Sequence, residues 1–213
     1  MEIVSNPVER IKHCLGDVYS GYFIPTVICG RSLCFKKDLN KFIKDFCDII
    51  YKEDLSLLED ENKDFGLKSL GSLFKERMIS KLLTVSPEEN ICDVWNLLWG
   101  VWADIFNSEP EGKSESYIIL HKTTCVYLMF YLYHCQSGLN NFVISLSLET
   151  FEACIDLAKI VLERFQVTSV VDVLNYLVSK KCINVALYDG IQYLYQNKYG
   201  KPLTIKKKSI SRS

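Results

Sequence analysis

The sequence has few residues that interrupt regular structure, with five prolines and ten glycines among 213 residues. So few breaks favour long helices over many short strands. It also lacks a long apolar run: the continuous run in its most apolar region covers only residues 125–133 and is followed by the polar break 136–138. A membrane-spanning helix needs about 20 apolar residues, so we expect no span.

Motifs of the common catalytic and metal-binding classes are missing as well. There is no G-x-G-x-x-G or G-x-x-x-x-G-K pattern for nucleotides. A zinc site needs four converging ligands, usually seeded by a tight C-x2-C pair. The nearest candidates, Cys29 and Cys34 with His13 and Cys14 upstream, are spaced too loosely. We therefore predict no enzyme activity, no cofactor and no bound metal.

The sequence has nine cysteines, and we expect no signal peptide, because the start Met1-Glu2-Ile3 has neither a basic nor a long apolar region. We expect a reducing compartment, in which most thiols act as small buried apolar groups. A remote alternative is an enzyme that uses Cys29, Cys34 or another thiol. A single thiol of unusual reactivity at neutral pH would support it.

Acidic residues are absent after Asp189, while six basic residues follow, so residues 1–197 carry 19 basic against 26 acidic side chains. An acidic body with a basic tail indicates contact with a polyanion, an acidic partner or nuclear import. The plain alternative is a solvated C-terminus that improves solubility. The tail residues that we expect to touch a DNA backbone or direct nuclear import are Lys206, Lys207, Lys208 and Arg212.

Apolar side chains recur at three- and four-residue spacing through most of the chain, which is the pattern of amphipathic helices. Residues 16–30 are expected to be irregular or extended, and 52–64 an exposed acidic loop. A capping box, Ser86-Pro87-Glu88-Glu89, predicts one helix start. Helices are predicted over residues 7–15, 35–50 (apolar face Phe35, Leu39, Phe42, Ile43, Phe46, Ile49 and Ile50), 67–82 (Leu67, Leu70, Phe74, Met78 and either Ile79 or Leu82 buried), 87–106, 116–136, 151–165 (Phe151, Ile155, Ala158, Val161, Leu162 and Phe165 buried; Ser147 or Thr150 as cap), 169–179 (Val170, Val173, Leu174 and Leu177 buried) and 185–195.

Residues 116–136 form the most apolar of these predicted helices, with almost no face left for water. A helix that is apolar all round belongs in the middle of a packed structure. The predicted fold class is therefore all-α: roughly eight helices packed as antiparallel hairpins around this central helix. We expect a single helical domain over residues 1–197, within which residues 1–85 could form an N-terminal subdomain, and a basic, flexible tail over residues 198–213.

Two groups of large aromatic residues have two possible roles each. Trp95, Trp99 and Trp102 follow one another at helical spacing, and packing in the core is their ordinary role. Trp99 lies beside the apolar stripe, so it could instead anchor a partner, as tryptophan often does. The central tyrosines need water or a partner for their hydroxyls when buried. The candidate protein-interface residues are Trp99, Tyr127, Tyr131 and Tyr133.

The order of features from Trp95 onward resembles the N-terminal helical region of subunit 1 of the small nuclear RNA-activating protein complex. That family has an aromatic helix of the type Y-L-L-Y-x-L-Y, which residues 127–133 (YLMFYLY) match. A polar break at 136–141 and an alternating segment follow, the latter leading into the pair Phe151-Glu152. Two helices (170–179 and 185–195) and the lysine-rich residues 206–208 complete the pattern.

This resemblance implies a nuclear, non-enzymatic subunit that assembles with a Myb-repeat subunit and a zinc-containing subunit. The assembled complex would bind a promoter element of small nuclear RNA genes, and this chain would meet DNA only through the complex. Lysine contacts to phosphates position a protein without reading sequence. The alternative function is a generic helical adaptor or scaffold, without a nucleic-acid role and located in the cytoplasm.

Overall fold

A computed structural model describes residues 26–52, 66–85, 91–136, 142–186 and 189. This portion of the chain is mostly helical, as the all-α prediction requires. The predicted number of eight helices, their antiparallel pairing and the domain boundaries stay predictions, because several expected elements lie outside the described residues. The elements are α2 (Thr26–Lys52), α3 (Leu67–Glu76), the 3-10 helix η3 (Ile79–Leu83), α4 (Ile91–Asn107), α5 (Glu115–His134), β1 (Ile144–Ser147), α6 (Leu148–Phe165), α7 (Ser169–Ser179) and β2 (Ile183–Ala186).

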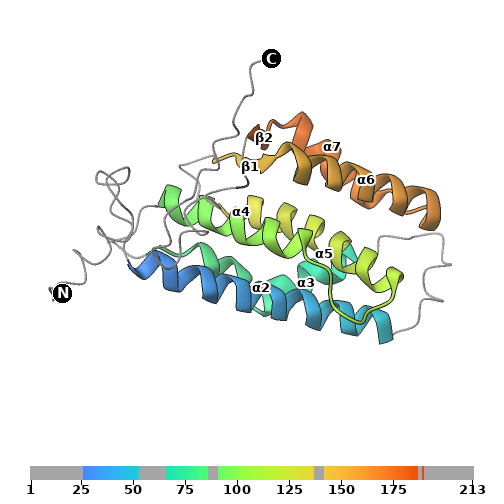
Figure 1. The fold of residues 1–213 in the computed structure, drawn as a ribbon, viewed down its shortest axis with the longest axis horizontal. Coiled ribbons are helices and arrows are strands. Elements are labelled where there is room, and N and C mark those ends of the chain that lie inside the picture. Colours follow the sequence, from blue (N-terminus) through green and yellow to red (C-terminus); the bar gives the residue numbers. More distant parts are fainter. Residues whose placement is uncertain (1–25, 53–65, 86–90, 137–141, 187–188, 190–213) are drawn as a thin grey trace, which may run out of the picture.

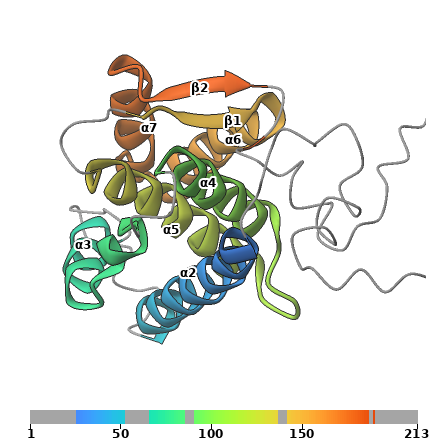
Figure 2. The same cartoon turned by 90° about the vertical axis from the view of Figure 1, so that its left-hand side faces the viewer.

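Helix α5 contacts each of the other α-helices that the structure describes. Helices α2 and α3 lie on one side of it, and α6, α7 and the two strands lie on the opposite side (Figures 1 and 2). Twelve of its residues are buried, including the polar His121, Thr123 and Thr124. Ser114 caps its start by accepting a hydrogen bond from the Tyr117 amide. Burial on all sides explains why this segment is apolar around its whole circumference.

Helix α4 lies beside α5 and is also buried over most of its surface. The Trp102 indole donates a hydrogen bond of 2.9 Å to the Cys125 carbonyl of α5. The Trp102 ring also stacks on Phe106, with centroids 5.2 Å apart. The predicted capping box before α4 lies outside the described residues.

Helix α2 begins at Thr26, so the prediction of irregular chain up to residue 30 was wrong for residues 26–30. Gly30 lies inside the helix. A helical glycine costs roughly 0.5–1 kcal/mol relative to alanine, which is small beside the burial of a 27-residue helix. The predicted apolar face is confirmed for Phe35, Leu39, Phe42, Ile43 and Phe46, which enter the core. It was wrong at its C-terminal end for Ile49, which is 44% exposed.

The predicted helix over 67–82 is interrupted after Glu76. Met78 adopts a left-handed conformation (φ 52°), and the chain continues as η3. This turn rotates the following residues, so Met78 is exposed, while Ile79, one of the two predicted alternatives, is buried. The predicted burial of Met78 was therefore wrong, while that of Leu70 and Phe74 is confirmed.

Strands β1 and β2 pair in parallel, with Ile144 opposite Ile183 and Leu146 opposite Val185. A helix over 185–195 was predicted, and its start was wrong because Val185 and Ala186 belong to β2. Most of the remainder lies outside the described residues. Parallel strands need a long crossover, which α6 and α7 provide here.

The buried face of α6 only partly coincides with the predicted one: Ala158 and Val161 are buried as predicted. Ile155 and Leu162 are exposed, contrary to prediction, and Cys154 and Leu157 enter the core. Ser147 caps the helix, accepting a hydrogen bond from the Thr150 amide. In α7 all four residues predicted to be buried are buried: Val170, Val173, Leu174 and Leu177.

Candidate partner-binding surface

Two of the four predicted interface residues lie inside the core. Trp99 is fully buried between Trp95 and Trp102, with ring centroids 5.2 and 6.0 Å away. Tyr127 is also fully buried, and its hydroxyl lies 2.5 Å from the Ser169 hydroxyl of α7. A side chain without exposed surface can affect a partner only through the helices that it holds in place.

Tyr131 and Tyr133 are half-buried at the C-terminal end of α5. The Tyr131 hydroxyl donates to the Leu67 carbonyl at 2.9 Å, and its ring stacks on Phe74 at 5.6 Å. The Tyr133 ring lies 6.4 Å from Trp95. A hydrogen bond to Cys182, together with burial, raises the pKa of Tyr133 to about 12, so its hydroxyl is protonated at neutral pH.

The end of α5 and the middle of α7 together form an aromatic ridge, made of Phe130, Tyr133, His134 and Tyr176. The Phe130 ring lies 4.6 Å from His134 and 5.6 Å from Tyr176. His134 and Tyr176 are exposed, the latter by 38%. Exposed, preorganised aromatic groups of this kind are typical anchors in protein interfaces.

Sequence reasoning found Tyr133 of this ridge but missed Phe130, His134 and Tyr176. Tyr176 is far from the other three in sequence and meets them only because α7 packs on α5. The only signal in the sequence was the mixture of aromatic residues and histidine at the end of α5. Such a mixture is as compatible with a buried surface as with an exposed one.

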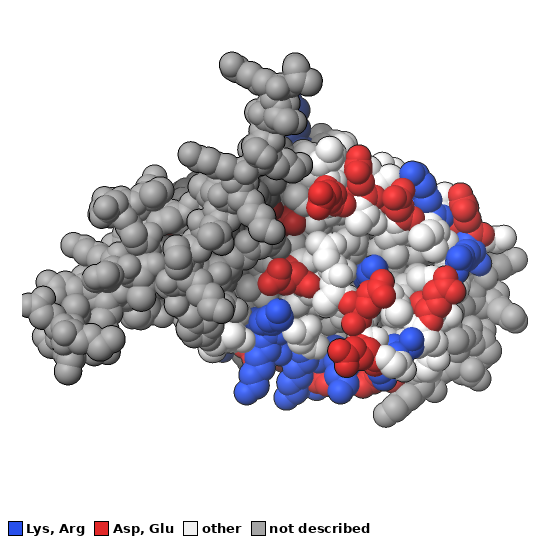
Figure 3. All heavy atoms as spheres, viewed as in Figure 1, with Lys and Arg blue, Asp and Glu red and all other residues white. Residues whose placement is uncertain are grey.

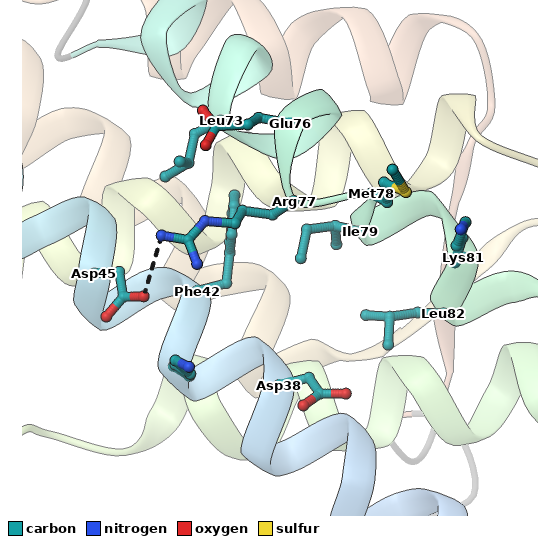
Figure 4. A pocket seen from close by; sticks show the side chains of 11 residues that line it. Asp38, Phe42, Asp45, Leu73, Glu76, Arg77, Met78, Ile79, Lys81 and Leu82 are labelled. Carbon is teal, nitrogen blue, oxygen red and sulfur yellow. Dashed lines mark ion pairs between the residues drawn. The ribbon is translucent and has the colours of Figure 1, made fainter.

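A groove of about 640 Å³ lies between α2 and the α3–η3 segment (Figure 4). Its apolar side comprises Phe42, Leu73, Ile79 and Leu82, and its charged side comprises Asp38, Lys41, Asp45, Glu76, Arg77 and Lys81. Arg77 reaches across to Asp45, with 3.9 Å between nitrogen and oxygen (Figure 4). An exposed pair of this kind stabilises the fold by about 0–1 kcal/mol. The groove therefore offers a surface on which acidic and basic side chains balance.

Charge on the face in Figure 3 varies from element to element. Basic side chains gather over α2, while the charged side chains along α6 are mostly acidic, with basic ones among them (Figure 3). The exposed face of α2 carries Lys36, Lys37, Lys41 and Lys44. Different elements of the body thus offer surfaces of opposite sign.

Burial shifts the pKa values of several titratable side chains so that their neutral forms are favoured. Burial raises the pKa of the Cys47 thiol to about 11 and that of Cys154 to about 12. Burial, with a smaller effect from Lys122, lowers the pKa of His121 to about 4. Thiols that stay protonated are poor nucleophiles, and a histidine with so low a pKa is a poor base at neutral pH.

Within the described ranges, no three histidine, cysteine or acidic side chains converge on a point where a metal ion could bind. Of the loose zinc candidates, Cys34 is exposed on α2. His13 and Cys14 lie outside the described residues, as do the tail residues Lys206, Lys207, Lys208 and Arg212. No helix in the described portion of the chain is both long and apolar enough to cross a membrane.

Comparison with known protein families finds a match. The family described as small nuclear RNA activating complex (SNAPc), subunit 1, matches residues 35–212. The matched range includes α2 from Phe35 onward, both candidate surfaces and most of the basic tail. No curated protein and no solved structure matches the chain.

Proposed function

Because the chain belongs to the family of subunit 1 of the small nuclear RNA activating complex, we propose that it is the helical assembly subunit of that complex and holds a Myb-type DNA-binding partner. The family is one of transcription-complex subunits, and the resemblance inferred from the sequence is confirmed by the match. The assembly role, the Myb-repeat and zinc-containing partners, the absence of catalysis and the nuclear location all belong to the proposal.

The observation that carries the proposal is the match over residues 35–212, which takes in nearly the whole described body. The aromatic ridge supports it, because His134 and Tyr176 leave ring surface open beside the half-buried Phe130 and Tyr133. Tyr131 packs against Phe130 of the ridge, so we include it in the proposed contact. Trp99 and Tyr127 contribute to this contact indirectly, because from the core they hold α4 and α5 in place beneath the ridge.

The proposed role of the tail is electrostatic. Lys206, Lys207, Lys208 and Arg212 follow a body that carries a net charge of about −7 over residues 1–197. In a promoter-bound complex, these side chains would contact phosphates without reading bases, and each contact would make binding more sensitive to salt. The same residues could direct nuclear import.

The proposal is tested by co-expressing the tagged chain with the Myb-repeat and zinc-containing subunits and measuring the stoichiometry of the purified complex. Equal amounts of all three chains are expected. Recovery of the tagged chain alone, well behaved and monomeric, would contradict the proposal and favour a generic adaptor.

A ridge variant locates the contact within that complex. Tyr176→Ala combined with His134→Ala removes the exposed half of the ridge and should weaken binding to the partner about tenfold or more. The matched control is Tyr51→Ala on α2, because Tyr51 is 40% exposed and Tyr176 is 38% exposed. If both variants bind like the wild type, the ridge is not the contact.

A further inference from the structure

Helix α6 carries an apolar stripe on its outer surface, formed by Leu148, Ile155 and Leu162. These side chains are 55%, 37% and 42% exposed. They follow one another at intervals of seven residues, which is close to two helical turns, so they lie on one side of the helix. At 1.5 Å per residue, this α6 stripe is about 21 Å long. It is the kind of seam along which a second helix packs.

The charges beside the α6 stripe are mostly acidic. The two basic residues of α6 are already engaged: Lys159 lies 2.9 Å from Asp156, and Arg164 pairs with Glu115 of α5. Three acidic residues, Glu149, Glu152 and Glu163, are exposed and form no ion pair with the residues that the structure describes. Figure 3 shows mostly acidic side chains along this helix, with basic side chains and uncharged surface among them.

Glu152 and Glu163 are placed to act together with the stripe. They are eleven residues apart, which is about three turns, so they lie on the same side of α6. Glu152 is one turn from Leu148, and Glu163 is next to Leu162. A helix laid along the stripe would therefore pass these two carboxylates near its two ends.

Resting on the proposed function, we propose that the α6 stripe binds an amphipathic helix of a partner subunit, with apolar residues at three- and four-residue spacing and lysine or arginine beside them. An apolar helix face is recognised by a complementary apolar face. The unpaired carboxylates favour a basic partner and repel an acidic one. They also disfavour nucleic acid, whose phosphates bind basic surfaces.

The basic tail of this chain is a poorer fit for the same surface. Residues 203–213 contain only three apolar side chains, Leu203, Ile205 and Ile210. Leu203 and Ile210 are a single heptad apart, which is too short for a stripe of about 21 Å. The occupant is therefore assigned to another subunit, and the tail becomes an outcome that the experiment distinguishes.

The occupant is identified by photo-crosslinking in the complex of this chain with the Myb-repeat and zinc-containing subunits. A benzoylphenylalanine at position 155 should crosslink to a partner segment with helical apolar spacing and an excess of lysine and arginine, read by mass spectrometry. Crosslinks to residues 190–213 of this chain, to a segment without basic residues, or to nothing would overturn the inference.

Affinity measurements test the apolar stripe and the acidic residues beside it separately. Ile155→Ala with Leu162→Ala should weaken binding to the partner about tenfold. The matched control is Ile49→Ala with Leu33→Ala on α2, which removes the same side chains at 44% and 55% exposure.

Glu152→Lys with Glu163→Lys should weaken binding roughly fivefold at low salt, and less at high salt. Its control, Glu109→Lys with Glu111→Lys in the loop after α4, makes the same change in net charge.

The outcomes separate the inference from the function on which it depends. If the complex assembles and the α6 variants bind like the wild type, the inference fails and the assembly function stands. If no complex assembles with the wild-type chain, both fail. Far-UV circular dichroism of every variant shows whether the helices are intact, since all the altered side chains are exposed.

Discussion

His121 makes the stability of this chain dependent on pH. Its side chain is 6% exposed on α5, and its Nδ1 atom has no hydrogen-bond partner among the residues that the structure describes. Burial, with a smaller effect from Lys122, lowers its pKa from 6.5 to about 4. The unfolded chain therefore binds a proton on this imidazole at a higher pH than the folded chain does. The contribution of the neutral imidazole to the free energy of unfolding is fully present above pH 6.5 and is lost as the pH falls towards 4.

The magnitude follows from the difference between the two pKa values. One pKa unit corresponds to about 1.36 kcal/mol, so the full shift is worth about 3 kcal/mol. Between pH 7 and pH 5, protonation of the unfolded chain should lower the free energy of unfolding by about 2 kcal/mol. A loss of this size is a large fraction of the stability of an ordinary domain.

The assay is urea unfolding of the wild type and of His121→Gln at pH 7, 6 and 5. Glutamine stays polar but cannot ionise, so the variant should lose about 2 kcal/mol less than the wild type over this range. The matched control is His134→Gln, which makes the same substitution at an exposed position of the same helix. Equal pH dependence in the wild type and His121→Gln would refute the assignment.

Three further predictions concern the core and the thiols. Asp189→Ala should lower the free energy of unfolding by about 2–3 kcal/mol in urea, because this buried carboxylate accepts hydrogen bonds from the residues that cap α6. Gly71→Ala should cost about 1–3 kcal/mol and lower the melting temperature, because its Cβ would come within 2.4 Å of the Tyr131 hydroxyl. Maleimide should label Cys34 rapidly and Cys125 only after unfolding, as read by mass spectrometry, because Cys125 is buried and its pKa is raised by that burial.

The helices were largely predictable because their signal is local. In α7 Val170, Val173, Leu174 and Leu177 recur at three- and four-residue spacing, and this spacing identifies the buried face. In α6 the pattern is ambiguous, because apolar residues occur on two adjacent faces. Contacts with α5, α7 and β1 decide in favour of Cys154 and Leu157, and leave Ile155 exposed.

Features that depend on distant segments of the chain were not predictable in this way. The alternating segment that follows the polar break contains β1, but the local pattern does not show which other segment it pairs with, and each strand exists because it pairs with the other. The aromatic ridge needs α7 beside α5 before Tyr176 can meet Phe130. The left-handed Met78 that divides α3 from η3 has no local signal, since methionine is common inside helices.

The pairing of β1 with β2 has a consequence for the order of folding. It joins residues on either side of the whole α6–α7 segment, so the chain must close a long loop before any backbone bond between the strands forms. We therefore expect this sheet to form late, after α6 and α7 have docked on α5. Asp189, which follows β2 in the chain, accepts a hydrogen bond from the backbone amide of Ser147. Hydrogen exchange of the Ser147 amide should therefore report each opening of this region.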